Sequence, residues 1–105
     1  MRALLRRMEE AMAPGSLDAV AVLLVRGAEV RAREVDFTMG GHHYRYPFIP
    51  EGEVWIDDAV SDGPDRAATV AHELAERTLM KHLGWAYDRA HTAANALERA
   101  VRRDA

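Results

Sequence analysis

The fold of this chain depends on one stretch, residues 71–84, with the sequence AHELAERTLMKHLG. Residues four apart share a face of a helix, so His72 and Glu76 are expected to project side by side. The same face continues through three apolar residues, Leu79, Met80 and Leu83. This pattern predicts a buried helix face that carries an imidazole and a carboxylate. Buried ionisable groups are costly unless they are paired or bound to a metal.

Glu73 follows His72 directly and points about 100° away from it, because 3.6 residues make one turn. In zinc-protease helices two ligands at positions i and i+4 hold the metal, and the Glu after the first ligand activates water. Here the second ligand position holds Glu76 in place of a histidine. We therefore assign Glu73 as a candidate catalytic base, and His72 and Glu76 as candidate metal ligands.

The flanking sequence predicts a single α+β domain over residues 1–105. A first helix is expected over residues 1–13, and the central helix over 64–83, with a cap near Gly63 and an end at Gly84. A second helix should follow Trp85 and continue to about Arg103. Because the connection between these helices is short, they are expected to fold back as an antiparallel pair.

Short runs of β-favouring residues predict a small sheet of three or four strands. The continuous apolar run 19–25 is typical of a strand covered on both faces. Residues 30–37 alternate with a one-residue shift, which indicates a bulge, a break or a helical turn. The aromatics of residues 44–48 alternate as in an edge strand, where Pro47 is tolerated. Residues 54–57 are expected to form the last strand.

Two further candidate ligands, His91 and Glu98, lie seven residues apart and hence on one face of the last helix. If that face turns toward the central helix, His72, Glu76 and His91 form a set of two imidazoles and one carboxylate. This is an accepted catalytic zinc set, with water in the fourth position. Glu98 is expected either to accept a hydrogen bond from a ligand imidazole or to replace one ligand. Zinc is the favoured ion, and manganese or iron would suit the same donors.

Other side chains near this set have two interpretations each. His42 and His43 follow two glycines and could reach a metal from a loop, although a plain loop is the simpler expectation. Tyr87 is either an oxyanion donor or, more simply, a core or capping aromatic. His72 and Glu76 themselves could form only a hydrogen-bonded pair, which stabilises a helix by a few tenths of a kcal/mol.

The candidate residues belong to a longer pattern in the C-terminal half of the chain. Its members are Trp55-Ile56-Asp57, His72-Glu73-Leu74-Ala75-Glu76, Leu79-Met80, Gly84, Tyr87, Ala90-His91 and Glu98. In this spacing the chain resembles a family of small, largely uncharacterised zincin-like proteins of phages and prophages. The resemblance implies a compact, metallopeptidase-like core with a divalent metal between the helices, but no particular substrate. A carboxylate in place of the second histidine lowers the positive charge of the site, so the metal is expected to polarise its water less than in a site with a further histidine.

The amino-acid composition limits the kinds of molecule that the protein is expected to bind. The net charge of −3 and pI of about 5.9 disfavour nucleic-acid binding, so the arginines of residues 1–13 are expected to be solvated. The chain has no cysteine, which excludes disulfides and thiolate ligands. The apolar run 19–25 is too short to span a membrane, and no signal peptide is recognised, so we expect a cytoplasmic protein. A homo-oligomer remains an open expectation.

These patterns together predict a divalent-metal-binding, metallopeptidase-like protein in which Glu73 is the general base. Its substrate or partner would be a peptide or a protein. The alternative is a non-enzymatic interaction module, stabilised by a metal or by a buried His-Glu network. In that case Trp55, Tyr44 and Tyr46 would be contact residues.

Overall fold

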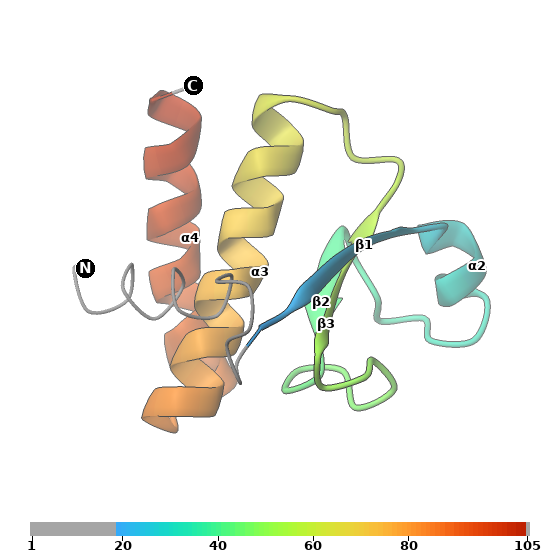
Figure 1. Ribbon diagram of the computed structural model, residues 1–105, viewed down its shortest axis with the longest axis horizontal. Helices are drawn as coiled ribbons and strands as arrows, with labels where there is room; N and C mark the ends of the chain where they lie inside the picture. Colours follow the sequence, from blue (N-terminus) through green and yellow to red (C-terminus); the bar gives the residue numbers. More distant parts are fainter. Residues whose placement is uncertain (1–18, 105) are drawn as a thin grey trace.

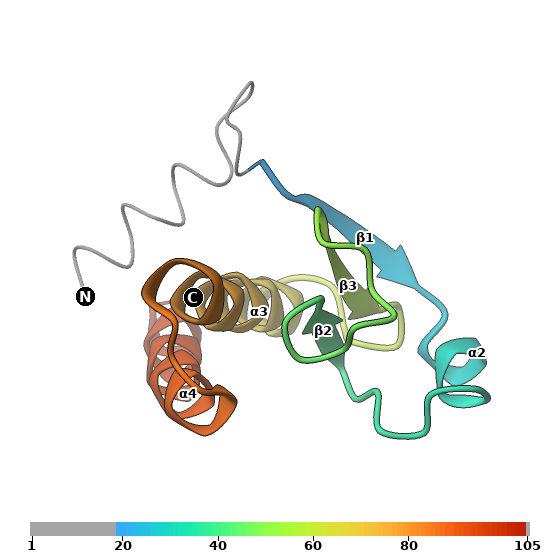
Figure 2. The ribbon, with the colours of Figure 1, turned by 90° about the horizontal axis from the view of Figure 1, so that it is seen from below.

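Helix α3, Pro64–Leu83, occupies the middle of the molecule, as seen in the computed structural model, which describes residues 19–104. Helix α4, Tyr87–Arg103, runs antiparallel along one side of α3, and a small sheet lies on the other side (Figures 1 and 2). The predicted α+β fold with a C-terminal helix hairpin is therefore confirmed. The first helix, predicted for residues 1–13, lies outside the described residues.

The sheet has three strands among the described residues: β1 (Ala21–Val25), β2 (Gly40–His42) and β3 (Glu53–Asp57). Strand β3 is central, pairing in parallel with β1 and antiparallel with β2. A five-residue helix, α2 (Gly27–Arg31), follows β1. No helix in residues 19–104 is both long and apolar enough to cross a membrane.

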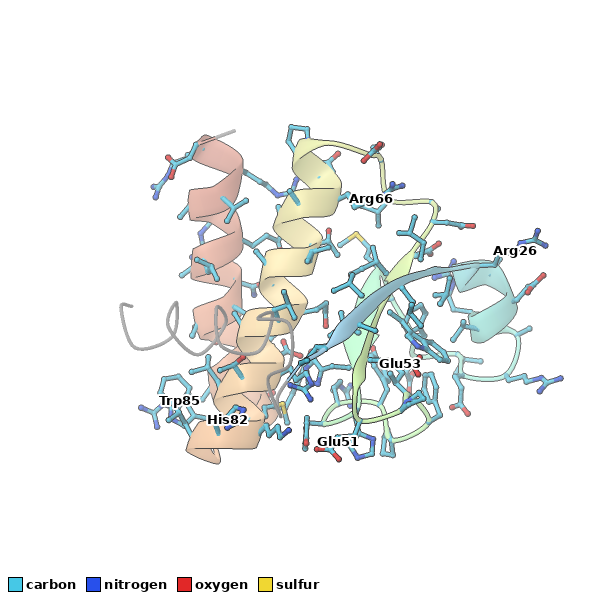
Figure 3. The ribbon with its side chains drawn as sticks, viewed as in Figure 1. Arg26, Glu51, Glu53, Arg66, His82 and Trp85 are labelled. Atoms are coloured by element: carbon cyan, nitrogen blue, oxygen red, sulfur yellow. The ribbon has the colours of Figure 1, made fainter. Side chains whose placement is uncertain are left out.

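The ends of α3 follow from local residue chemistry. Pro64 occupies the first turn, where its fixed φ suits the helix and its missing N–H is not needed. Gly63 is the residue before it, and no side chain caps the helix there. Gly84 ends the helix in the left-handed region with φ 67°, and the Trp85 N–H donates to the carbonyl of Leu79 at 3.1 Å. Trp85 therefore lies at the connection between α3 and α4 (Figure 3).

Two apolar clusters hold α3 between its neighbours. Against α4, the buried residues are mostly small, which allows the two helices to approach closely: Ala75, Leu79, Ala90, Ala94 and Leu97. Against the sheet, Leu74 packs on Val54 and Ile56 of β3. On the far face of β3, Trp55 meets the rings of Phe37 and Phe48, with centroids 6.5 and 5.9 Å away.

Strand β1 is found where it was predicted, but the prediction that both of its faces are covered is wrong. Val22, Leu23 and Leu24 are 38%, 40% and 54% exposed, because β1 is the edge strand farthest from β2. The run is apolar without being enclosed by the described residues. The continuous β-favouring run therefore predicted the position of the strand correctly, but it did not predict how exposed the strand is.

The aromatic segment 44–48 was predicted to be a strand, and this is also wrong. It forms turns instead, with the Tyr46 N–H donating to the carbonyl of His42 at 2.9 Å. Its aromatic residues alternate because their rings cluster around Phe37. The centroid of the Phe37 ring lies 5.7 Å from that of Tyr46 and 6.4 Å from that of Phe48. Residues 30–37 contain the end of α2 and turns, in agreement with the break or helical turn expected there.

Leu83 was expected to continue the buried stripe of the central helix, but its side chain is 46% exposed. It is the last residue of α3, beyond the part of the helix that α4 and the sheet cover. Leu79, one turn earlier, is buried as predicted.

Candidate metal centre

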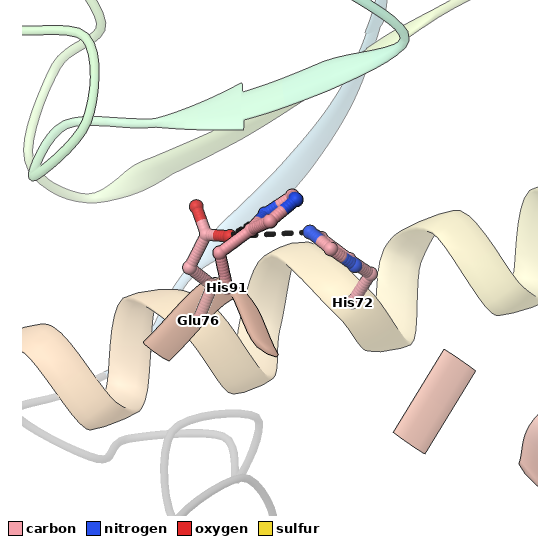
Figure 4. Close-up of side chains that lie close together, drawn as sticks. All are labelled: His72, Glu76 and His91. Atoms are coloured by element: carbon pink, nitrogen blue, oxygen red, sulfur yellow. Dashed lines mark hydrogen bonds and ion pairs between the residues drawn. The ribbon is translucent and has the colours of Figure 1, made fainter. Parts of the chain in front are cut away.

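His72, Glu76 and His91 meet between α3 and α4, as their spacing predicts (Figure 4). Oε2 of Glu76 lies 3.1 Å from Nε2 of His72 and 2.8 Å from Nδ1 of His91. His72 and Glu76 are buried, whereas the side chain of His91 is 41% exposed. The two helices thus place two imidazoles on one carboxylate oxygen, at a point that remains accessible from the side of His91.

Glu76 accepts hydrogen bonds from three imidazoles. Its second oxygen, Oε1, lies 2.9 Å from Nε2 of His42, which is fully buried on β2. Burial alone would raise the pKa of Glu76, but the hydrogen bonds from His42, His72 and His91 outweigh it and lower this pKa to about 2. Glu76 is therefore a carboxylate at neutral pH, in the protonation state that a metal ligand needs.

His42 was expected to lie in a plain loop, with metal binding from that loop as the alternative, and the structure instead brings its ring to Glu76. It lies in β2 and not in a loop, and its register opposite Val54 aims its side chain at α3. His43, by contrast, turns away and binds the carbonyl oxygen of Ile49 at 2.9 Å. The signal was the pair Gly40-Gly41, because glycine in a strand often marks close approach by another group. A Cβ at Gly40 would lie 3.1 Å from Cγ of Glu73, so the strand approaches α3 closely beside this site.

Glu73 lies beside the three-residue cluster and is almost fully enclosed. Its Oε2 is 3.8 Å from Nε2 of His72, and no described residue hydrogen-bonds to its carboxyl group. Burial raises the pKa of Glu73 to about 8; the charges of Glu76 and Glu98 add to this rise, and His72 opposes it. The raised pKa favours the protonated form of Glu73, which lies next to the imidazole of His72.

Glu98 reaches the opposite side of the His72 ring from α4. Its Oε1 lies 3.0 Å from Nδ1 of His72, although this buried nitrogen has no described partner in hydrogen-bond geometry. Its Oε2 lies 3.1 Å from the guanidinium of Arg102, which also pairs with Asp65. Glu98 therefore lies close to the imidazole of His72 without the hydrogen bond expected of a supporting carboxylate, and its other oxygen pairs with Arg102.

The charges around His72 determine its proton affinity. Burial alone would lower the pKa of this imidazole, but its hydrogen bond with Glu76 and the charges of Glu73, Glu76 and Glu98 raise it overall. The carboxylates near this imidazole give it a negatively charged environment, to which Glu73 adds when it is ionised. Such an environment favours a cation, either a proton or a metal ion.

A cavity of about 260 Å³ opens next to these residues. Its wall includes His72, Glu73 and Glu76 of α3, together with His91 of α4. The hydroxyl of Tyr87 lies 3.3 Å from Nδ1 of His91, and the two rings stack with centroids 5.2 Å apart. Tyr87 therefore faces the cavity beside the ligand set and is not a core residue.

The donor set fits a divalent ion. The candidate ligand atoms of His72, Glu76 and His91 all lie within 4.8 Å of one another, and a second group, His42, Glu73 and Glu76, shares Glu76 with the first. Zinc–nitrogen and zinc–oxygen bonds of about 2.0–2.1 Å in a tetrahedron separate neighbouring ligand atoms by about 3.3 Å. The observed separations of 3.1 and 2.8 Å need to widen by only a few tenths of an ångström. These buried His and Glu groups could therefore hold a divalent metal ion, which would replace the imidazole protons.

Comparisons of the chain with protein-family models, with curated proteins and with solved structures found no match.

Proposed function

We propose that this protein binds a divalent metal ion, zinc by preference, through His72, Glu76 and His91, and acts as a metallopeptidase-like hydrolase on a peptide or amide. The observation that carries the proposal is the convergence of two imidazoles from two helices on one ionised carboxylate oxygen, at 3.1 and 2.8 Å. Two His and one carboxylate with an open position are typical of catalytic rather than structural zinc sites. The adjoining cavity offers room for a substrate.

The surrounding residues suit the roles of such a site. A bound divalent ion would supply Lewis-acid polarisation of water and of a carbonyl group, and its charge would favour the ionised form of Glu73. Glu73 would accept the proton of the attacking water and deliver it to the leaving amine. The Tyr87 hydroxyl borders the same cavity and would donate a hydrogen bond to a developing oxyanion. Glu98, whose Oε1 lies 3.0 Å from Nδ1 of His72, would fix the orientation of that imidazole ring.

A second candidate function is a non-enzymatic interaction module held by the His-Glu network. Its support is that Glu76 already receives three imidazole hydrogen bonds, so the buried carboxylate is satisfied by protein groups alone. Trp55 and Tyr46, proposed as contact residues in that reading, instead pack in the aromatic cluster with Phe48. Tyr44 remains partly exposed and bonds Glu51.

Metal content and hydrolysis, measured on three proteins, test the proposal. Wild type, Glu73→Gln and the control Glu34→Gln, an exposed glutamate away from the cavity, are dialysed against zinc and assayed with a pool of quenched fluorescent peptides. All three should retain one zinc per chain, and only Glu73→Gln should lose hydrolysis. Wild type without bound zinc would contradict the metal site, and hydrolysis that persists in Glu73→Gln would contradict the role of that base. Stoichiometric zinc without any hydrolysis would favour the interaction module.

A further inference from the structure

Arg45 is an exposed residue that lines the cavity beside the candidate metal centre. It lies on the turn that follows β2, and His91 and Glu76 line the same cavity. No carboxylate of residues 19–104 pairs with its guanidinium. Three acidic residues, Glu73, Glu76 and Glu98, also line the cavity, so Arg45 supplies a positive charge to a mostly acidic wall.

The guanidinium is held by aromatic rings rather than by an acid. Its Cζ lies 4.5 Å from the ring centroid of Tyr87 and 5.3 Å from that of Tyr46. Both rings are fixed independently: Tyr87 stacks on His91, and the hydroxyl of Tyr46 donates to the carbonyl of Asp36 at 2.8 Å. Arg45 also hydrogen-bonds the side chain of Tyr87, and a guanidinium stacked on an aromatic face has further N–H groups with which to bind a planar anion.

From this geometry we propose that Arg45 is a specificity residue that binds a carboxylate of the substrate, next to the bond placed at the metal centre. The inference rests on the proposed function and extends it to a substrate class, namely peptides or amides with an adjacent carboxylate. Arginine pairs with carboxylates through two parallel N–H···O bonds, which gives direction as well as charge attraction. The carboxylate could belong to a chain terminus or to an acidic side chain.

Three inhibitor probes distinguish these sources. Each carries a hydroxamate, which binds zinc, on a succinyl linker joined to leucine with a free carboxylate, to leucine amide, or to aspartate amide. The dissociation constants are measured by calorimetry on the zinc-loaded protein and on Arg45→Gln. The matched control is Arg89→Gln, because Arg89 is also a guanidinium over an aromatic ring, 3.7 Å from the centroid of Trp85, but lies outside the cavity.

Wild type and Arg89→Gln should prefer one of the carboxylate probes to the leucine amide by about tenfold, as expected for a charge-assisted pair. Arg45→Gln should lose this preference while it binds the neutral probe with unchanged affinity. Preference for the leucine acid would identify a terminal carboxylate, and preference for the aspartate amide an acidic side chain. The role of Arg45 would be overturned if wild type bound all three probes with equal affinity, or if Arg45→Gln kept the preference for a carboxylate probe. It would also be overturned if Arg45→Gln lost as much affinity for the neutral probe as for the carboxylate probes. Failure of all three probes to bind zinc-loaded wild type would instead contradict the metal centre, and this proposal with it.

Discussion

Replacing Glu73 by glutamine should change how the stability of the metal-free protein depends on pH. Because burial raises the pKa of Glu73 to about 8, the folded protein keeps a proton that the unfolded chain releases near the usual value of 4.5. Between these two pH values the folded state binds more protons than the unfolded state. The free energy of unfolding of wild type therefore falls as the pH rises.

The expected size of this effect follows from the two pKa values. Each pH unit between them corresponds to 1.36 kcal/mol, with less near pH 8 where the folded group begins to ionise. Between pH 5.5 and pH 8 wild type should thus lose ~3 kcal/mol of stability through Glu73 alone. Glutamine resembles the protonated carboxyl group in shape and cannot ionise. The advantage of Glu73→Gln over wild type should therefore grow by ~3 kcal/mol between pH 5.5 and pH 8.

Urea unfolding in the presence of a chelator, at several pH values between 5.5 and 8, measures this difference. The exposed residue Glu34 supplies the control: Glu34→Gln should follow wild type throughout. A smaller fall should remain in Glu73→Gln, because the raised pKa of His72 contributes stability that is present below its usual value of 6.5 and lost at higher pH. Parallel curves for wild type and Glu73→Gln would refute the reasoning, since Glu73 would then be ionised in the folded protein.

Three further outcomes are expected. Zinc should raise the melting temperature of wild type by mass action, and His72→Ala should abolish that rise; an unchanged response would refute the site as drawn. Glu98→Gln should weaken zinc binding by ~10–100-fold in a competition titration, because a neutral amide supports His72 Nδ1 less well, and equal affinities would return Glu98 to the role of a surface residue. Gly27→Ala should destabilise the protein, as measured by urea unfolding, because a Cβ there would lie 2.0 Å from the carboxylate of Asp57; wild-type stability would show that the start of α2 accommodates the added methyl group.

The helical half of the fold could be predicted because its determinants are local. The 3.6-residue period of the apolar stripe, Pro64 at the start of α3 and Gly84 at its end act within a few residues of where they occur. The short connection at Gly84 then requires an antiparallel partner. This is sufficient to bring His91 to Glu76, although fifteen residues separate them.

The part of the site contributed by the sheet could not be predicted in the same way. Strand β2 has only three residues, two of them glycines, and exists through pairing with β3 and close approach to α3. These contacts are distant in sequence and leave no periodic pattern. His42 therefore resembled a loop residue, although its ring is fully buried against Glu76. Residues 44–48 were misassigned as a strand for the opposite reason. Their aromatic residues alternate as in a strand, but this alternation reflects packing of the rings within turns.

The extended X-ray absorption fine structure at the zinc edge, measured on protein loaded with one equivalent of zinc, tests the central claim most directly. Two imidazole ligands should be resolved, with nitrogen and oxygen atoms at about 2.0–2.1 Å. In His91→Ala the spectrum should retain one imidazole and gain an oxygen ligand. A wild-type spectrum without imidazole scattering, or one that is unchanged in His91→Ala, would contradict a metal centre formed by His72, Glu76 and His91.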